Sequence, residues 1–252
     1  MKKLLFVILN LFLVASIFLT ISFRKVTVLP SVNNNMKNGI AVVELFTSEG
    51  CSSCPPADEV AAAIQKEFPD NVFVLGFHVD YWDYIGWKDE YSNAAFTKRQ
   101  QDYAEHFALR SIYTPEIVLN GEKEFVGSNS NKLHNEVEAA LNNSLKETIV
   151  LSTSETENNT ITVNYIYSNK EKAIINFALV QLTATSNVKR GENSGRKLHH
   201  INVVRDFKTV EVVSGKINLT IPAGLSTKDV KIIAYAQEKS SLKVVAAAAL
   251  SF

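Results

Sequence analysis

The chain has 252 residues, of which 46% are hydrophobic and 21% are charged, a composition typical of a globular protein with a sizeable core. Its 26 basic residues balance its 26 acidic residues, and no long run of one charge is present. This balance argues against nucleic-acid binding, which needs a basic surface, and against a basic helix that would lie on a membrane. The 2 cysteines are too few for a small secreted domain held together by disulfides.

The N-terminal residues have the pattern of an export signal. Met1 and two lysines precede an apolar run from Leu4 to about Ile21, which is just long enough to span a bilayer. We therefore expect residues 1–22 to be either a cleaved signal peptide or an uncleaved membrane anchor. Either one places the rest of the chain outside the cytoplasm, free in the periplasm or anchored, where disulfides persist. Residues 23–38 contain a proline and a run of asparagines, which predicts a linker.

Residues 39–146 alternate between strand and helix patterns. Nearly continuous apolar segments predict buried strands at Ile40–Thr47 and Val72–Val79, and apolar residues at helical spacing predict a helix between them that starts near Pro55. These elements form one βαβ unit with a right-handed crossover. The carboxyl ends of its two strands therefore lie at one edge of the sheet, where α/β proteins place their sites.

The rest of this region predicts a helical insert, a hairpin and a closing helix. The aromatic cluster Tyr81–Trp87 and a helical segment follow the second strand. Asn120-Gly121 is a strong hairpin signal between two short strands, and apolar residues from Leu133 to Leu145 mark the last helix. The order β-α-β, helical insert, β-β-α predicts a thioredoxin-like α/β domain.

From residue 147 onward the pattern changes to short alternating strands separated by turn residues. About eight such strands fit an antiparallel β-sandwich, so we expect a second domain at 147–252. One long polar loop at 187–197 interrupts the pattern. A loop of this length in a compact domain is either functional or mobile.

The segment Cys51-Ser52-Ser53-Cys54 holds the only cysteines of the chain, between a buried strand and the start of a helix. A helix N-terminus lowers the pKa of a thiol, so Cys51, first in the motif and expected to be the more exposed, is the predicted attacking thiolate. Cys54 is the predicted resolving thiol, and the two form a disulfide when oxidised. The alternative is an inert disulfide in a non-enzymatic binding protein. Zinc is not expected, because no second cysteine pair supplies further ligands.

Polar residues on the strands that flank the motif are further candidates. Glu44 interrupts the apolar first strand and either relays protons to the resolving thiol or accepts a structural hydrogen bond. His78 and Asp80 point to the same face of their strand and can line the cleft beside Cys51. There they would be acid–base groups, or ligands of a soft metal such as Cu(I) together with the two thiolates. A structural histidine is the plain alternative.

Two further groups of residues can contact a substrate. Trp82, Tyr84 and Trp87 include both tryptophans of the chain, and they either form a wall for a bound substrate or cap the core under the insert. Arg196 and its neighbours in the loop at 187–197 either close over the site or form an ordinary solvated loop.

A resemblance to a known family rests on the segments Val43–Asp58, His78–Tyr84, Tyr113–Pro115, Gly191–Arg196 and Asn202–Arg205. Together they resemble the DUF1223 family, which comprises bacterial exported proteins of thioredoxin-like fold with a largely undefined biochemical role. The resemblance covers about residues 40–250.

The resemblance implies roles for two residues of the predicted hairpin region. By similarity to thioredoxin-like proteins, Thr114 and Pro115 match the cis-proline loop that packs against the active-site disulfide. Two features depart from the thioredoxin pattern: Gly50 replaces the usual aromatic residue, and the insert lengthens the distance from Cys54 to the proline.

We therefore expect an exported thiol–disulfide oxidoreductase whose partner is a protein or a small-molecule thiol or disulfide. The reaction would proceed through a mixed disulfide on Cys51 that Cys54 resolves. This chemistry needs no bound organic cofactor.

Overall fold

The computed structural model describes residues 39–169 and 173–252. The expected signal peptide or anchor at 1–22 and the expected linker at 23–38 lie outside the described residues. Among the helices of the described residues, none is both long enough and apolar enough to cross a bilayer.

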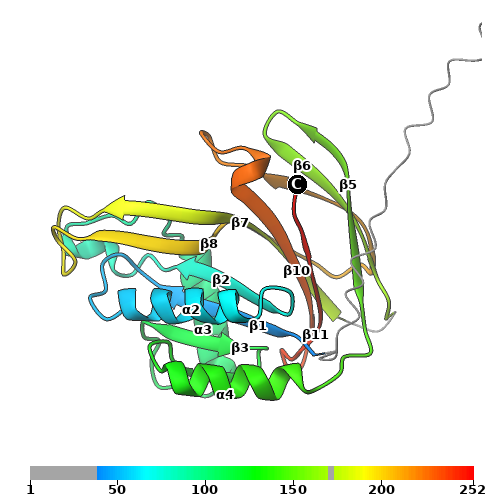
Figure 1. Ribbon diagram of the computed structural model, residues 1–252, viewed down its shortest axis with the longest axis horizontal. Helices are drawn as coiled ribbons and strands as arrows, with labels where there is room; N and C mark the ends of the chain where they lie inside the picture. Colours follow the sequence, from blue (N-terminus) through cyan, green and yellow to red (C-terminus); the bar gives the residue numbers. More distant parts are fainter. Residues whose placement is uncertain (1–38, 170–172) are drawn as a thin grey trace, which may run out of the picture. The chain divides into compact units, whose positions relative to one another are not determined.

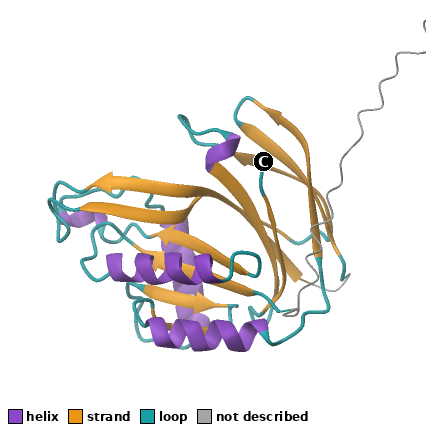
Figure 2. Ribbon diagram, viewed as in Figure 1, coloured by secondary structure: helices purple, strands orange, loops and turns teal. Residues whose placement is uncertain are grey.

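The N-terminal half is a thioredoxin-like sheet between helices (Figures 1 and 2). Its elements are β1 (Ala41–Thr47), α2 (Pro55–Glu67), β2 (Val72–His78), the short helix η1 (Asp83–Ile85), α3 (Ala94–His106), β3 (Glu116–Leu119), β4 (Lys123–Val126) and α4 (Ser130–Leu141). Strand β1 pairs in parallel with β2 and antiparallel with β3, which pairs with β4. Helices α2 and α4 pack on one face of this sheet, and α3 packs on the other. The predicted order of elements is confirmed.

Strand β1 is buried on both faces, which explains its nearly continuous apolar sequence. Successive side chains of a strand point to opposite faces. Val43 and Leu45 pack with α2 and α4, whereas Val42 and Phe46 pack with α3. Glu44 shares the α3 face, so it points away from the face that carries α2.

The C-terminal half does not form the expected self-contained sandwich, because four of its strands extend the thioredoxin-like sheet. These strands are β7 (Ala173–Asn187), β8 (Lys197–Val210), β10 (Val230–Glu238) and β11 (Val244–Leu250). The resulting sheet has 8 strands in the order β11-β10-β7-β8-β2-β1-β3-β4. Strand β8 joins β2 in parallel where Val203 lies opposite Gly76.

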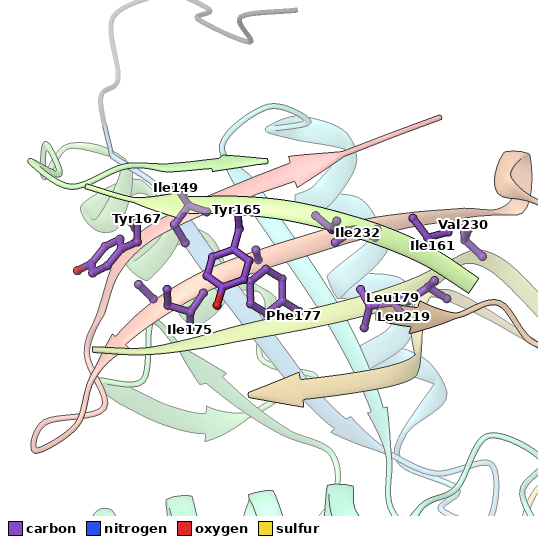
Figure 3. Close-up of a cluster of buried hydrophobic side chains, with 14 of the residues drawn as sticks. Ile149, Ile161, Tyr165, Tyr167, Ile175, Phe177, Leu179, Leu219, Val230 and Ile232 are labelled. Atoms are coloured by element: carbon purple, nitrogen blue, oxygen red, sulfur yellow. The ribbon is translucent and has the colours of Figure 1, made fainter. Parts of the chain in front are cut away.

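A second, smaller sheet covers part of the large one (Figure 3). It consists of β5 (Ile149–Glu157), β6 (Thr160–Tyr167) and β9 (Ser214–Thr220), in the order β5-β6-β9. Its inward residues, such as Ile161 and Tyr165, pack against Phe177 of β7 and Ile232 of β10. The expected two-layer packing of strands is therefore present, but the large sheet of the thioredoxin-like half continues into one of the layers.

Two local features refine the predicted elements. Asn120 and Gly121 both have positive φ, at 50° and 67°, as a tight hairpin between β3 and β4 requires. Strand β8 is longer than the short strands expected in this region, and its pairing with β7 shifts by one residue at Arg205. The long loop lies at 188–196 and connects β7 to β8; we call it the covering loop, for the contacts described below.

Candidate active site

The two cysteines form a disulfide at the junction of β1 and α2. Their Cα atoms are 5.4 Å apart, and Cys54 is the N-cap of α2. The first two helical residues are Pro55 and Pro56, which carry no N–H, and the N–H groups of Ala57 and Asp58 both donate to the Cys54 carbonyl oxygen. The first turn of α2 therefore has no free N–H for a thiolate.

The disulfide is covered, although the serines between the cysteines are exposed. Cys51 and Cys54 are each 1% exposed. The prediction that Cys51 is the more exposed of the two is therefore wrong. The reason is tertiary, since segments far away in the chain pack over the motif.

One of these segments contains the Thr114–Pro115 peptide bond, which is cis. The Thr114 carbonyl oxygen lies 3.7 Å from Cys51 Sγ. The indole Nε1 of Trp82 donates to Thr114 Oγ1 at 2.8 Å, so Trp82 holds the insert against this loop. The structure thus places Thr114, Pro115 and Trp82 beside the disulfide, as the resemblance implied for the proline loop.

The covering loop is the second segment, and it belongs to the C-terminal half. Asn193 is fully buried, and its Nδ2 donates to the carbonyl oxygens of Glu49 at 2.8 Å and Cys51 at 2.9 Å. The Ser52 N–H donates to Glu192 Oε2 at 3.0 Å. Arg196 donates from Nη1 to Asn193 Oδ1 at 2.8 Å. Arg196 therefore orients Asn193, and the loop closes over the motif.

Beside the motif lies a buried polar cluster that sequence reasoning largely missed. His78 Nδ1 is 2.7 Å from Asp89 Oδ2, and His200 Nδ1 is 3.2 Å from Asp58 Oδ2. His200 Nε2 also faces Glu49 Oε1 across 3.7 Å. Of this cluster only His78 was predicted. Glu49 and Asp58 lie inside the motif segment and were available as a signal, whereas nothing near His200 in the sequence connects it with the cysteines.

Comparison with known proteins assigns the chain to a family. The family described as "Protein of unknown function (DUF1223)" matches residues 42–237. This chain is a DUF1223 protein. It is 31% identical over 86 residues to a thioredoxin from Methanocaldococcus jannaschii, a match that covers 34% of this chain and 78% of the thioredoxin.

A solved structure supports the fold of the DUF1223 chain over both halves. The crystal structure of a protein from Agrobacterium tumefaciens matches with a TM-score of 0.65 and 28% identity. The match covers 86% of this chain and 96% of that chain. The thioredoxin-like part and the strands added to it therefore recur together in another protein.

The charges of the buried cluster follow from its contacts. Burial alone would lower the pKa of His200, but the hydrogen bond with Asp58 and the nearby Glu49 carboxylate outweigh it and raise this pKa to about 10. Burial would raise the pKa of Asp89, but the His78 side chain and the backbone N–H groups of Glu49 and Tyr91 lower it below its ordinary value. In the DUF1223 chain His200 is therefore an imidazolium at neutral pH.

Several predicted site residues lie away from the disulfide. Glu44 faces the opposite side of the sheet, where Arg99 binds it with Nε–Oε2 at 2.5 Å, so it is not brought to the resolving thiol. Asp80 accepts from Thr97 Oγ1 at 2.5 Å and anchors the start of α3. Tyr84 is 83% exposed. Trp87, in contrast, donates to Glu49 Oε2 at 2.7 Å and so contacts the buried cluster beside the motif.

The arrangement gives no support to a copper site. His78 is 1% exposed and is paired with Asp89 instead of facing the two sulfurs from an open cleft. Within the described part of the DUF1223 chain, no group of three or more His, Cys, Asp or Glu side chains is placed to hold a metal ion.

Glu116, next to the cis proline, titrates near neutrality. It is fully buried, and burial raises its pKa from 4.5 to about 7 although Gln100 donates to Oε2 at 2.6 Å. The folded chain thus holds this proton more tightly than the unfolded chain. The resulting stability is fully present below about pH 4.5 and is lost as pH rises through about 7.

We expect Glu116→Gln to remove this dependence. Relative to the wild type, the variant should gain roughly 3 kcal/mol of unfolding free energy between pH 4.5 and pH 8, because one pKa unit corresponds to about 1.4 kcal/mol. Urea unfolding at both pH values measures this, with the exposed Glu122→Gln as control. Equal pH dependence in wild type and Glu116→Gln would show that Glu116 does not titrate in this range.

Proposed function

We propose that this chain is an exported thiol–disulfide oxidoreductase that exchanges electrons with a thiol or disulfide partner. The observation that carries the proposal is the disulfide at the head of α2 with the Thr114 carbonyl oxygen of the cis-proline loop 3.7 Å from Cys51. Homology to a thioredoxin over the N-terminal half supports the same chemistry. The partner is a protein or a small molecule, and the apolar N-terminal run supports a location outside the cytoplasm.

In the proposed reaction a partner thiolate attacks Cys51 Sγ, which is the sulfur beside the proline loop. The Cys51–Cys54 bond breaks, its electron pair leaves on Cys54 Sγ, and the partner is joined to Cys51 by a mixed disulfide. A second partner thiolate then attacks the partner's own sulfur and releases Cys51. The partner loses two electrons, and the two cysteines gain them. The same steps run in reverse when the chain reduces a partner disulfide.

Burial of both sulfurs is the observation that favours a second candidate, an inert disulfide in a binding protein. The two candidates differ in reduction potential. An exchanging pair should lie in the range of about −120 to −270 mV, and a structural disulfide should lie below about −300 mV.

Trapping in the exported fraction tests the proposal directly. Cys54→Ser leaves Cys51 unable to resolve a mixed disulfide, so we expect covalent adducts that dithiothreitol releases and mass spectrometry identifies. Cys51→Ser is the matched control. In this variant the remaining thiol is Cys54, which is the resolving cysteine and not the sulfur beside the proline loop, so it should form far fewer mixed disulfides with partners. An absence of adducts together with a potential below about −300 mV would favour the binding protein.

A further inference from the structure

Asp58 lies on the same side of α2 as Cys54. The two residues are four positions apart, and Cys54 already has helical backbone angles, φ −76° and ψ −40°. Side chains at this spacing are neighbours on a helix face. Asp58 is also buried, so its carboxylate is largely removed from solvent, as is the Cys54 side chain.

Asp58 is bound by a cation that comes from the other half of the chain. His200 lies on β8, the strand that attaches the C-terminal half to β2, and it is 3% exposed. Its Nδ1 is 3.2 Å from Asp58 Oδ2. Its ring also packs against His78, with ring centroids 4.8 Å apart, and against Tyr91, at 6.0 Å.

The other ring nitrogen of His200, Nε2, has no hydrogen-bond partner among the described residues. Nε2 and Glu49 Oε1 face each other across 3.7 Å, and neither atom has a hydrogen-bond partner. Buried polar atoms in native proteins are nearly always paired, so such an exception calls for an explanation. The ionisable groups around His200 are Asp58 from α2, Glu49 from the turn before it, His78 from β2 and Tyr91 from the insert. Asp89 is hydrogen-bonded to His78, whereas Glu49 and Asp58 are the carboxylates that face the two ring nitrogens of His200.

The negative charge of the Glu49 and Asp58 carboxylates would disfavour cleavage of the Cys51–Cys54 bond if His200 were absent. The leaving Cys54 sulfur carries a negative charge, and two buried carboxylates nearby disfavour a third. An imidazolium between the carboxylates offsets their charge and holds a proton that can be passed on. The geometry therefore suits protonation of the leaving sulfur.

We propose that His200, acting through Asp58, supplies the proton that Cys54 takes up when the disulfide opens. This inference rests on the proposed thiol–disulfide exchange. As the partner thiolate bonds to Cys51 Sγ, the electron pair of the broken bond stays on Cys54 Sγ. Asp58 accepts the proton from His200 and passes it to that sulfur, which leaves a neutral imidazole. Solvent returns a proton to His200 after the exchange. His200 is thus a positioning residue, contributed to the redox site by the C-terminal half.

The test compares rates of disulfide reduction by dithiothreitol in the full chain from pH 5 to pH 10, normalised to the thiolate form of the reagent. The variants are His200→Gln, Asp58→Asn and the double variant. We expect the wild-type rate to fall as pH approaches 10. Each single variant should be slower by on the order of 100-fold at neutral pH and should lack that fall. The double variant should be no slower than the slower single one, because the two residues act in series.

Tyr103→Phe is the matched control. Tyr103 is as buried as His200 but donates to Glu44 on the opposite face of the sheet, so its loss should lower stability and leave the pH profile unchanged. Wild-type rate and profile in His200→Gln would overturn the inference, and so would additive effects in the double variant. Failure of the wild type to exchange at all would instead contradict the proposed function.

A measurement on the unaltered chain covers the case in which the variants do not fold. The imidazole of His200 is followed by ¹⁵N NMR against pH in the oxidised and in the reduced chain. If protonation of His200 is coupled to protonation of Cys54, the imidazole should titrate with different midpoints in the oxidised and in the reduced chain. Equal midpoints would overturn the inference.

Discussion

Asn193→Ala is expected to speed reduction of the Cys51–Cys54 disulfide about 30-fold. Both sulfurs are 1% exposed, so a reductant reaches them only when a segment packed over the motif moves, and the covering loop is one of the two such segments. Asn193 holds the closed state through its two hydrogen bonds to the carbonyl oxygens of Glu49 and Cys51. Each such bond contributes about 1 kcal/mol, and a loss of about 2 kcal/mol raises the open population about 30-fold.

Time courses of thiol appearance under excess dithiothreitol measure this effect, and urea unfolding shows whether global stability falls as well. Ser194→Ala is the matched control, because Ser194 lies in the same loop and its hydroxyl donates to the Lys189 carbonyl oxygen within that loop. We expect its rate to equal that of the wild type. If Asn193→Ala is reduced at the wild-type rate, the disulfide is reached without movement of this loop.

Arg99→Met is expected to destabilise the chain by about 3–5 kcal/mol, because it leaves the Glu44 carboxylate buried without its cationic partner. Glu44 is 1% exposed and accepts from Arg99 Nε at 2.5 Å and from Nη2 at 2.8 Å. The same Nη2 lies 2.8 Å from Tyr235 Oη and 3.1 Å from Gln237 Oε1, both on β10. Arg99 therefore ties β1 and α3 of the thioredoxin-like half to a strand of the C-terminal half.

Urea unfolding followed by tryptophan fluorescence measures this loss, and Lys98→Ala is the control on the same helix. Lys98 forms an exposed ion pair with Asp102, and such pairs contribute little, so we expect a change of less than about 1 kcal/mol. A similarly small change in Arg99→Met would contradict the prediction that the buried ion pair with Glu44 is needed for stability.

The two halves of the chain therefore depend on each other at two places. On the α3 face, Arg99 links Glu44 to β10. On the α2 face, Asn193 and His200 bring the covering loop and β8 against the cysteine motif. This dependence explains why a thioredoxin-like part of the chain carries additional strands: they complete the sheet and cover the site.

Local patterns of the sequence predicted the individual elements and the position of the cysteine motif. Periodicity was sufficient for the order of strands and helices up to Leu141, because each pattern depends on residues close together in the chain. The turn at Asn120-Gly121 was predictable for the same reason, since both positions require positive φ. The two cysteines, and the proline matched to them by resemblance, identified the site.

Tertiary structure alone decided what surrounds that site. Strand pairing between β2 and β8 joins backbones that are distant in sequence, and no local pattern distinguishes an added strand from a separate sandwich. In the same way His200 meets Asp58, and Asn193 meets Cys51, only because the sheet places β8 and its loop beside α2. Two roles were open for Glu44 from the sequence, proton relay and structural hydrogen-bond acceptance, and its pairing with Arg99 agrees with the second. The alternation of side chains along β1 turns it to the opposite face, and only the packed helices show which face carries the disulfide.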